Sequence, residues 1–412
     1  MASESSRPTA LRHDRHFRRY WMARMSSLAG STVSYVALPV LVYDLTGSGG
    51  WTALVAAAAA APYLCFGAVA GAIADRADRR ALMVGADVMS AVVMAAVALS
   101  QALGVLTATH VQVAAVSTQT LFVFFDAANI GALHCLVDRD RLARANSAIY
   151  GVTTAIEVAA PTVAGVLLFL AAPAYLMAFD ALSYLVSAIL IGTIPRRLMG
   201  DPAPGRRTLR RDVVEGVAFL FRHRTVRLVT LVGGLTNIAV AAFLGQLVPW
   251  LHEGFGVHAT HDLRFAVTWA ALGGGGLAAS VAFPMLVARF GAGRLVLLLL
   301  PGLTLTAVGC AAAPWWPVAT VALAAWYLLF TVFALNAITL RQRATPAHLQ
   351  GRVHTVGRML AYGLGWPTGA LLGAASAQAV GVTAAAWSAA LVHAGTLALA
   401  LTPACRRVLW SR

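Results

Sequence analysis

The sequence contains no lysine and few acidic residues, and these two shortages constrain what the chain can be. Charged residues make up only 11% of its 412 positions, whereas hydrophobic residues make up 59%. A water-soluble domain has about 25% charged and about 45–50% apolar residues. A single core facing water would not cover so much apolar surface, so we expect the chain to lie in a lipid bilayer.

The shortage of negative charge leaves a net charge of +15, which by itself would suit a protein that binds nucleic acid. The distribution of the 31 basic residues, all of them arginine, excludes that interpretation. They form short clusters between long apolar runs, which is typical of the loops of a membrane protein. We therefore expect a bilayer partner and no nucleic acid.

Cysteine is also scarce, and its placement excludes a disulfide framework. Cys65 and Cys310 lie inside apolar runs, whereas Cys135 and Cys405 lie at the ends of runs on the side that we assign to the cytosol. Disulfides form in oxidising compartments, and no pair of cysteines faces the outside. We expect four free thiols.

Several chemical motifs are missing. The chain has no phosphate-binding loop, no strand-turn-helix nucleophile motif and no helix with metal-ligand spacing. We therefore expect no nucleotide-driven pumping, no enzyme activity and no cofactor. The histidines between Leu251 and Asp262 could suggest a metal, but a solvated loop is the favoured interpretation.

Long apolar runs separated by polar breaks dominate what is present. A helix that crosses the hydrocarbon core needs about 20 residues. Twelve runs of this kind occur, at about 21–43, 51–73, 81–103, 109–135, 147–170, 173–194, 227–250, 266–288, 294–312, 316–338, 353–375 and 380–402.

Arginine placement predicts the orientation of these spans. With the N-terminus in the cytosol, every arginine except Arg264 falls on the cytosolic side, as the positive-inside rule requires. Both termini are then cytosolic, and we expect a multi-pass protein of the cytoplasmic (inner) membrane. The predicted organisation is a basic segment 1–20, six spans in 21–194, a cytosolic linker 195–226, six spans in 227–402 and a tail 403–412.

Two short patterns recur at half the length of the chain. Leu142–Asn146 precedes the fifth span and Pro161–Gly165 lies within it; Leu349–Val353 precedes the eleventh span and Pro367–Leu371 lies within it. Recurrence at matching positions predicts two related six-helix halves.

The loop between the second and third spans carries a family signature. It reads Gly71-Ala-Ile-Ala-Asp75-Arg76-Ala-Asp78-Arg79-Arg80. This resembles the signature loop of the major facilitator superfamily, with Asp78 in place of the usual glycine, as in the branch of macrolide-efflux and siderophore-export permeases. The resemblance implies an all-α integral membrane protein with twelve transmembrane helices in two pseudo-symmetric six-helix bundles.

The same resemblance implies a gating role for this loop. In the family the loop latches the outward-open state against the neighbouring half. Transferred to this chain, the resemblance implies that Asp75 contacts the start of the eleventh span, with Arg358 as candidate partner. Ordinary positive-inside topology is the alternative interpretation of the charges. One departure is Ala160–Gly165, which only partly matches the exporter pattern Gly-Pro-x-x-Gly-Gly and therefore keeps import open.

Carboxylates inside apolar runs are candidates for coupling. A charge near the bilayer centre costs about 2.5–3.5 kcal/mol, so such residues usually serve a pathway. Asp126 and Glu157 lie at similar depth in the fourth and fifth spans, and Asp180 in the sixth is a third candidate. Each could carry a proton or contact substrate, or simply bond to a neighbouring helix. Asp87 we expect beside Arg24 or the loop arginines.

Polar and aromatic side chains recur in the spans that line the cavity of the resembled fold, the first, fourth, seventh and tenth. Sparse polar groups among aromatics suit a mostly apolar ligand. Helix packing is the alternative at each position. The candidates are Ser31, Tyr35, Gln119, Phe122, Asn237, Gln246, Tyr327 and Asn336.

The sequence thus predicts a monomeric secondary transporter that exports a small, mostly apolar compound, such as a drug, an antibiotic or a siderophore-like metabolite, in exchange for protons. Import by proton symport is a second hypothesis. A membrane receptor or enzyme that moves nothing across the bilayer is a third.

Overall fold

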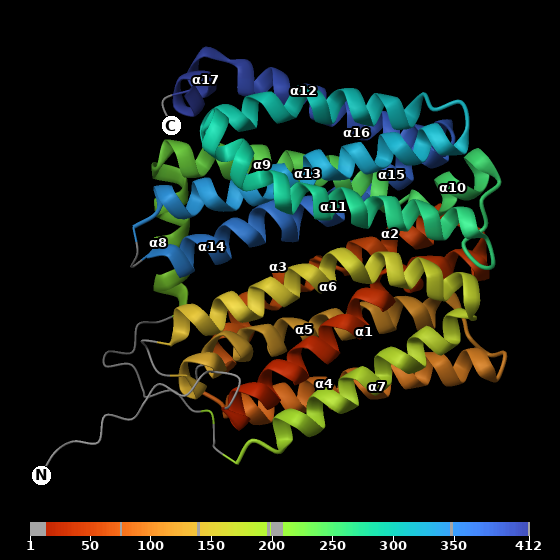
Figure 1. Cartoon of the computed structure of the whole chain (residues 1–412), viewed down its shortest axis with the longest axis vertical. Coiled ribbons are helices and arrows are strands. Elements are labelled where there is room, and N and C mark those ends of the chain that lie inside the picture. Colours follow the sequence, from red (N-terminus) through yellow and green to blue (C-terminus); the bar gives the residue numbers. More distant parts are fainter. Residues whose placement is uncertain are drawn as a thin grey trace, which may run out of the picture.

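The computed structural model describes residues 14–74, 76–137, 141–195, 198, 209–346 and 349–410. All regular elements within these ranges are helices (Figure 1). They are α1 (Arg15–Thr46), α2 (Gly49–Ala58), α3 (Ala61–Ala74), α4 (Arg79–Ala102), α5 (Ala108–Leu136), α6 (Leu142–Leu170), α7 (Pro173–Gly192), α8 (Leu209–Arg222), α9 (Arg224–Leu244), α10 (Leu247–Phe255), α11 (Leu263–Phe290), α12 (Ala292–Ala311), α13 (Trp316–Ala344), α14 (Gln350–Arg358), the π-helical segment η3 (Met359–Leu364), α15 (Gly365–Val380), α16 (Thr383–Leu401) and α17 (Pro403–Trp410).

Ten helices in the described part of the chain are long and apolar enough to cross a bilayer. The predicted fifth and eleventh spans are occupied by α6 and by the run α14–η3–α15. Helices satisfy every backbone N–H and C=O internally, which is what the hydrocarbon core demands. The prediction of an all-α membrane protein is confirmed.

The helices form two groups. Figure 1 shows α1 to α7 together below and α9 to α17 together above, and we call these the first half and the second half. Within the first half α7 packs on α4 and α1; within the second half α9 packs on α15 and α16. The halves meet where α6 packs on α11 and where α2 packs on α15. The start of α14 and the helix α8 lie at one end, which we call the linker end, and α10 marks the opposite α10 end.

Side chains at the helix starts explain where several spans begin. The carboxylate of Asp14 accepts hydrogen bonds from the backbone of the first turn of α1, and Asp78 does the same for α4. Such caps satisfy N–H groups that lack a partner within the helix. At the other end of α1, Gly47 has φ 60°, a left-handed conformation that favours glycine and ends the helix.

Small residues let helices of the second half approach closely. A side chain on Gly369 or Gly373 of α15 would overlap the carbonyl oxygens of Ile238 and Ala242 of α9. Close backbone contact of this kind is how apolar helices associate in lipid, where apolar burial alone provides no driving force.

Candidate functional site

Arg358 joins the two halves of the molecule. It is the last residue of α14, and its guanidinium donates a hydrogen bond of 2.8 Å to the hydroxyl of Tyr63 in α3. The same guanidinium lies 3.6 Å from the carboxylate of Asp126 in α5 and 4.3 Å from the centre of the Tyr63 ring. An ion pair, a charge-assisted hydrogen bond and a cation–π contact therefore meet at one cation.

A group of aromatic rings packs beside this cation. Tyr63 packs edge-on against Phe122 and Tyr362, with ring centres 6.4 and 6.3 Å apart, and Tyr362 packs on Trp366. The side chain of Arg358 is nevertheless partly exposed, so water screens its charge on the side that the rings leave open. We call Tyr63, Phe122, Asp126, Arg358 and Tyr362 the inter-half cluster.

The backbone changes its form directly after Arg358. Met359 to Leu364 form a π-helical turn, and Tyr362 lies within it. Such turns are rare and occur frequently at functional sites. A Cβ on Gly363 would lie 3.5 Å from the backbone nitrogen of Leu64, so η3 and α3 approach each other closely here. The eleventh span is therefore irregular at the point where it meets the first half.

The predicted gating loop is bonded to its own half. Gly71 lies in α3, Asp75 lies outside the described residues, and Arg76 is exposed. Asp78 accepts a hydrogen bond from the backbone of Leu198 in addition to capping α4.

The paired arginines of this loop extend the same pattern. Arg79 bonds the carbonyl of Gly131 and the sulfur of Cys135 in α5, and Arg80 bonds the carbonyl of Gly192 in α7. The expected contact between Asp75 and Arg358 involves a residue outside the described part of the chain. The contacts that Arg358 makes with the first half within that part include Tyr63 and Asp126.

The other predicted carboxylates lie apart from the cluster. Asp180 of α7 is buried and faces Ser34 of α1 and Ser183. Asp87, which we expected beside Arg24 or the loop arginines, is buried in α4 and faces Ser187 and Asp180. Glu157 lies in α6, and its side chain is outside the described part of the structure.

The predicted lining residues divide into two sets. Phe122 belongs to the inter-half cluster, and Tyr35 lies near Tyr362 and Tyr327 of the second half. Gln119 is half-buried on α5, about one turn before Phe122.

The remaining four make hydrogen bonds within the protein, three of them between helices or helix ends and one within its own helix. Ser31 bonds the hydroxyl of Tyr184, and Asn237 bonds the carbonyl of Gly233 in its own helix. Gln246 donates to the carbonyl of Gly49 at the α10 end, and buried Asn336 donates to that of Ala292.

Polar contacts also join the halves at the α10 end. The hydroxyl of Tyr43 bonds Glu253 at 3.1 Å, and Gln246 bonds the carbonyl of Gly49 at 2.7 Å. The imidazole of His261 lies 3.1 Å from the carbonyl oxygen of Phe169. These contacts hold the two halves together at this end.

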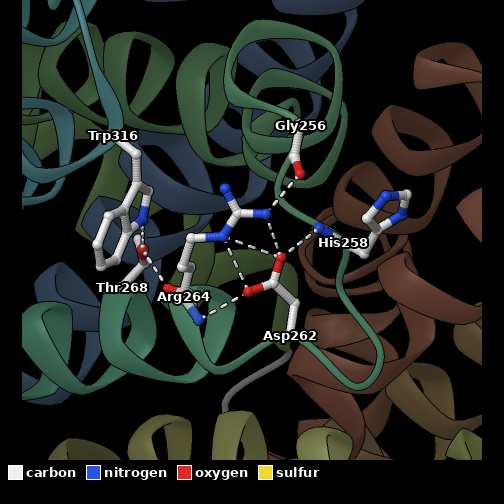
Figure 2. A network of polar contacts seen from close by, with 6 residues as sticks. All are labelled: Gly256, His258, Asp262, Arg264, Thr268 and Trp316. Carbon is white, nitrogen blue, oxygen red and sulfur yellow. Dashed lines mark hydrogen bonds and ion pairs between the residues drawn. The ribbon is translucent and has the colours of Figure 1, made fainter.

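The histidine-rich loop at this end is organised by Asp262 (Figure 2). Its carboxylate caps α11, bonds the guanidinium of Arg264 at 2.7 Å and accepts the backbone N–H of His258. Burial raises the pKa of Asp262, but the hydrogen bonds from Arg264 and His258 outweigh burial and the net pKa lies below its usual range. Among the described residues no group of three candidate ligands could hold a metal ion.

Sequence reasoning missed Tyr63 and Tyr362. Both signals were weak: Tyr63 lies midway along the second predicted span, and Tyr362 follows Arg358 by four residues, about one helical turn. Neither position carries a charge, so a search for intramembrane carboxylates does not find them.

Comparisons with known proteins agree with this architecture. The sequence profile of the family described as transmembrane secretion effectors matches residues 6–407. The chain is similar to the multidrug efflux pump Tap of Mycobacterium tuberculosis strain H37Rv, at 27% identity over 93% of this chain and 90% of that protein. It is also similar to Tap of Mycolicibacterium fortuitum, at 26% identity over 92% of this chain and 91% of that protein.

Solved structures show the same fold at low sequence identity. A mutant of the nucleoside transporter NupG has a TM-score of 0.72 at 10% identity, covering 96% of this chain and 98% of that one. A bacterial homologue of the iron transporter ferroportin in an inward-facing state has a TM-score of 0.69 at 15% identity, with coverage of 96% and 98%. The chain therefore belongs to the transmembrane secretion effectors of the major facilitator superfamily, and it is a membrane transporter and not an enzyme.

Proposed function

We propose that this transporter exports a small, mostly apolar compound by proton antiport with alternating access. The observation that carries the proposal is the contact of Arg358, in the second half, with Asp126 and Tyr63, in the first. A charged contact between the halves, placed among aromatic rings, connects protonation to the relative position of the halves.

Protonation of Asp126 changes this contact directly. A proton on Asp126 neutralises the carboxylate and removes the ion pair, so Arg358 keeps its contacts with Tyr63 but loses the opposite charge. The state in which the halves meet at this point then loses stability relative to a state in which they do not. A cationic substrate that replaces Arg358 beside Asp126 needs the carboxylate in its ionised form, so a proton on Asp126 weakens substrate binding and, because linkage is reciprocal, bound substrate weakens proton binding. Proton binding and substrate binding are thereby opposed, which is the requirement for antiport.

The energy available is sufficient for export. Each charge moved across about 100 mV supplies about 2.3 kcal/mol, enough for roughly a fifty-fold gradient. Aromatic side chains with sparse polar groups suit a mostly apolar substrate, and the inter-half cluster has that composition.

Similarity supports export as the direction. The Tap relatives are multidrug efflux pumps, and the likeness covers nearly all of each chain. Ala160–Gly165 matches the exporter pattern only in part, so import by proton symport is the alternative. The direction of flux in sealed vesicles separates the two.

We further propose that the linker end faces the cytosol, with both termini inside and six spans in each of 21–194 and 227–402. The chain then lies in the cytoplasmic membrane and acts as a monomer. Topology reporters test this orientation: a reporter near Arg206 should read as cytosolic, and a reporter near Arg264 as external. A reporter near Arg206 that reads as external contradicts the orientation.

Transport in proteoliposomes tests the mechanism. With an imposed proton gradient, wild-type protein should move an apolar cationic dye out of the compartment that corresponds to the cytosol. Asp126→Asn and Glu157→Gln separate the two carboxylates, and Thr120→Val is the matched control on α5, because the Thr120 hydroxyl bonds a carbonyl of its own helix. Proton-driven transport that survives in both carboxylate variants and in the double variant contradicts the carboxylate mechanism.

A further inference from the structure

A second pair of carboxylates lies inside the first half, away from the inter-half cluster. Asp87 in α4 is 2% exposed and Asp180 in α7 is 1% exposed, and the two lie close enough to interact electrostatically. The side chain of Asp180 also lies against Gly30 of α1, where an added Cβ would be 2.5 Å from its Oδ1. We call Asp87 and Asp180 the acid pair.

Hydroxyl groups face both members of the acid pair. Ser34 of α1 and Ser183 and Tyr184 of α7 face Asp180. Ser187 of α7 faces Asp87. In the part of the chain that the structure describes, no arginine or histidine is paired with either carboxyl group.

Several buried polar atoms around the acid pair have no partner in good hydrogen-bond geometry. They are Oδ2 of Asp87 and the hydroxyl oxygens of Ser34 and Ser187, and these two serines are 4% and 0% exposed. Asp180 accepts a bond from Ser183 at 3.2 Å. A charged carboxylate that is removed from water needs a cation or several well-placed donors. The described part of the structure gives the acid pair no cation and few well-placed donors, and two negative charges near each other would also repel.

We propose that Asp87 and Asp180 form one proton-holding site, with at least one carboxyl group protonated at neutral pH. A proton on one of the two carboxyl groups removes a charge and converts one acceptor oxygen into a donor, which can bond to the hydroxyl oxygen of a neighbouring serine such as Ser34 or Ser187. The ligand of this site is a proton, and the carboxyl oxygens are the atoms that bind it.

Hydroxyl groups lie between the acid pair and the interface between the halves. Tyr184 lies one turn after Asp180 on the same face of α7, and its hydroxyl is 3.0 Å from that of Ser31 in α1. One turn after Ser31 on α1 is Tyr35, which lies near Tyr362 of the second half.

A proton can pass along this row of hydroxyl groups and leave each hydroxyl with the same number of protons as before. In the proposed relay, a proton that arrives at Ser31 displaces the proton of Ser31 to Tyr184. Tyr184 lies near Asp180 and Asp87, and it passes its own proton to a carboxylate oxygen when the two approach to hydrogen-bond distance. Each hydroxyl accepts one proton and releases one, so neither changes charge, and the carboxylate is neutralised. Tyr184 and Ser31 are positioning residues in this relay.

The infrared spectrum of the full-length protein in lipid tests the site without any transport. A protonated carboxyl group gives a C=O stretching band that is separate from those of carboxylates and shifts in D₂O. We expect this band in wild-type protein at neutral pH, its loss in Asp87→Asn/Asp180→Asn, and its persistence in Asp44→Asn, which removes an exposed carboxylate at the α10 end. Absence of the band from wild-type protein, or its survival in the double variant, overturns the proposal.

Two milder variants keep the test decisive if the double variant does not fold. Ser187→Ala removes only a hydroxyl that faces the acid pair, and it should shift the frequency of the band. Tyr184→Phe should slow the exchange of the carboxyl proton for deuterium about tenfold or more. A band of wild-type frequency in Ser187→Ala overturns the assignment, and unchanged exchange in Tyr184→Phe overturns the relay.

A role of the acid pair in transport rests on the proposed antiport. If it takes part, Asp87→Asn and Asp180→Asn should each lower proton-driven flux about tenfold or more while substrate exchange without a proton gradient continues. Wild-type protein that carries the band but moves nothing in response to a proton gradient would overturn the proposed function and leave the proton site standing. Undiminished proton-driven flux in both variants would overturn the role in transport.

Discussion

Removal of one hydroxyl group should change how often the two halves meet at the inter-half cluster. The substitution is Tyr63→Phe, which keeps the ring that lies under Arg358 and against Phe122 but removes the oxygen that accepts the 2.8 Å bond. The halves lose one charge-assisted hydrogen bond and keep the cation–π contact. Any effect is therefore assigned to a single interaction.

The size of the effect follows from the environment of the bond. A hydrogen bond to a charged group contributes about 1.5–3 kcal/mol. The side chain of Arg358 is 41% exposed, so water replaces part of the lost bond and the lower end of the range applies. About 1.4 kcal/mol is tenfold in an equilibrium constant. We expect the population ratio of this conformation to the alternative to fall about tenfold.

Distance measurements between spin labels provide the assay. Labels at Arg18 and Arg343, exposed positions at the linker end of the first and second halves, report the separation of the halves. Tyr63→Phe should broaden or shift the distance distribution, and Thr120→Val should leave it unchanged. An unchanged distribution in Tyr63→Phe would refute the reasoning, most clearly if Tyr63→Ala does shift it, because the ring and not the hydroxyl would then hold the halves together.

Two further predictions concern stability. Gly373→Ala should lower the stability of the fold by about 1–3 kcal/mol, because the new methyl group overlaps the carbonyl of Ala242 and forces α15 away from α9. Gly395→Ala is the control: Gly395 has open space around it, so this variant should be neutral or stabilising in the same thermal unfolding assay. Asp262→Ala should cost about 1 kcal/mol at neutral pH through loss of the helix cap. The pKa of Asp262 is lowered in the folded state, so its ionised carboxylate contributes fully to the stability of the fold above the ordinary aspartate pKa of about 3.9. This contribution is lost only as the pH falls through the folded-state pKa. A difference between wild type and Asp262→Ala that already shrinks between about pH 7 and about pH 5 would contradict this assignment.

The sequence by itself determined the kind of protein and its all-helical fold. Lipid cannot bond to the backbone, so every crossing must be a helix of about 20 apolar residues, and such runs are visible without a structure. The spans predicted at 81–103 and 173–194 correspond to α4 (Arg79–Ala102) and α7 (Pro173–Gly192). The charged loop from Gly71 to Arg80 identified the superfamily, because its pattern is local and needs no tertiary contact to be seen.

Only the tertiary structure decided which side chains meet. Depth in the membrane follows from counting residues along a helix, and this placed Asp126 and Asp180 within α5 and α7. Rotation about the helix axis and the choice of neighbouring helix follow from packing between segments far apart in the chain. For that reason the contacts of Arg358 with Asp126 and with Tyr63, which lies 295 residues away in sequence, were not predicted.

The same physical reason explains the outcome for Asp87. Its depth suited a partner near the cytosolic arginines, but α4 packs along α7, and this contact turns Asp87 toward Ser187 and Asp180. Hydropathy and charge fix how far into the bilayer a residue lies, because the bilayer imposes one axis on every helix. Packing between helices fixes the rotation of each helix about its axis and the choice of its neighbours. Packing depends on the shapes of both helix surfaces at once, and these shapes cannot be seen when the sequence is read one residue at a time.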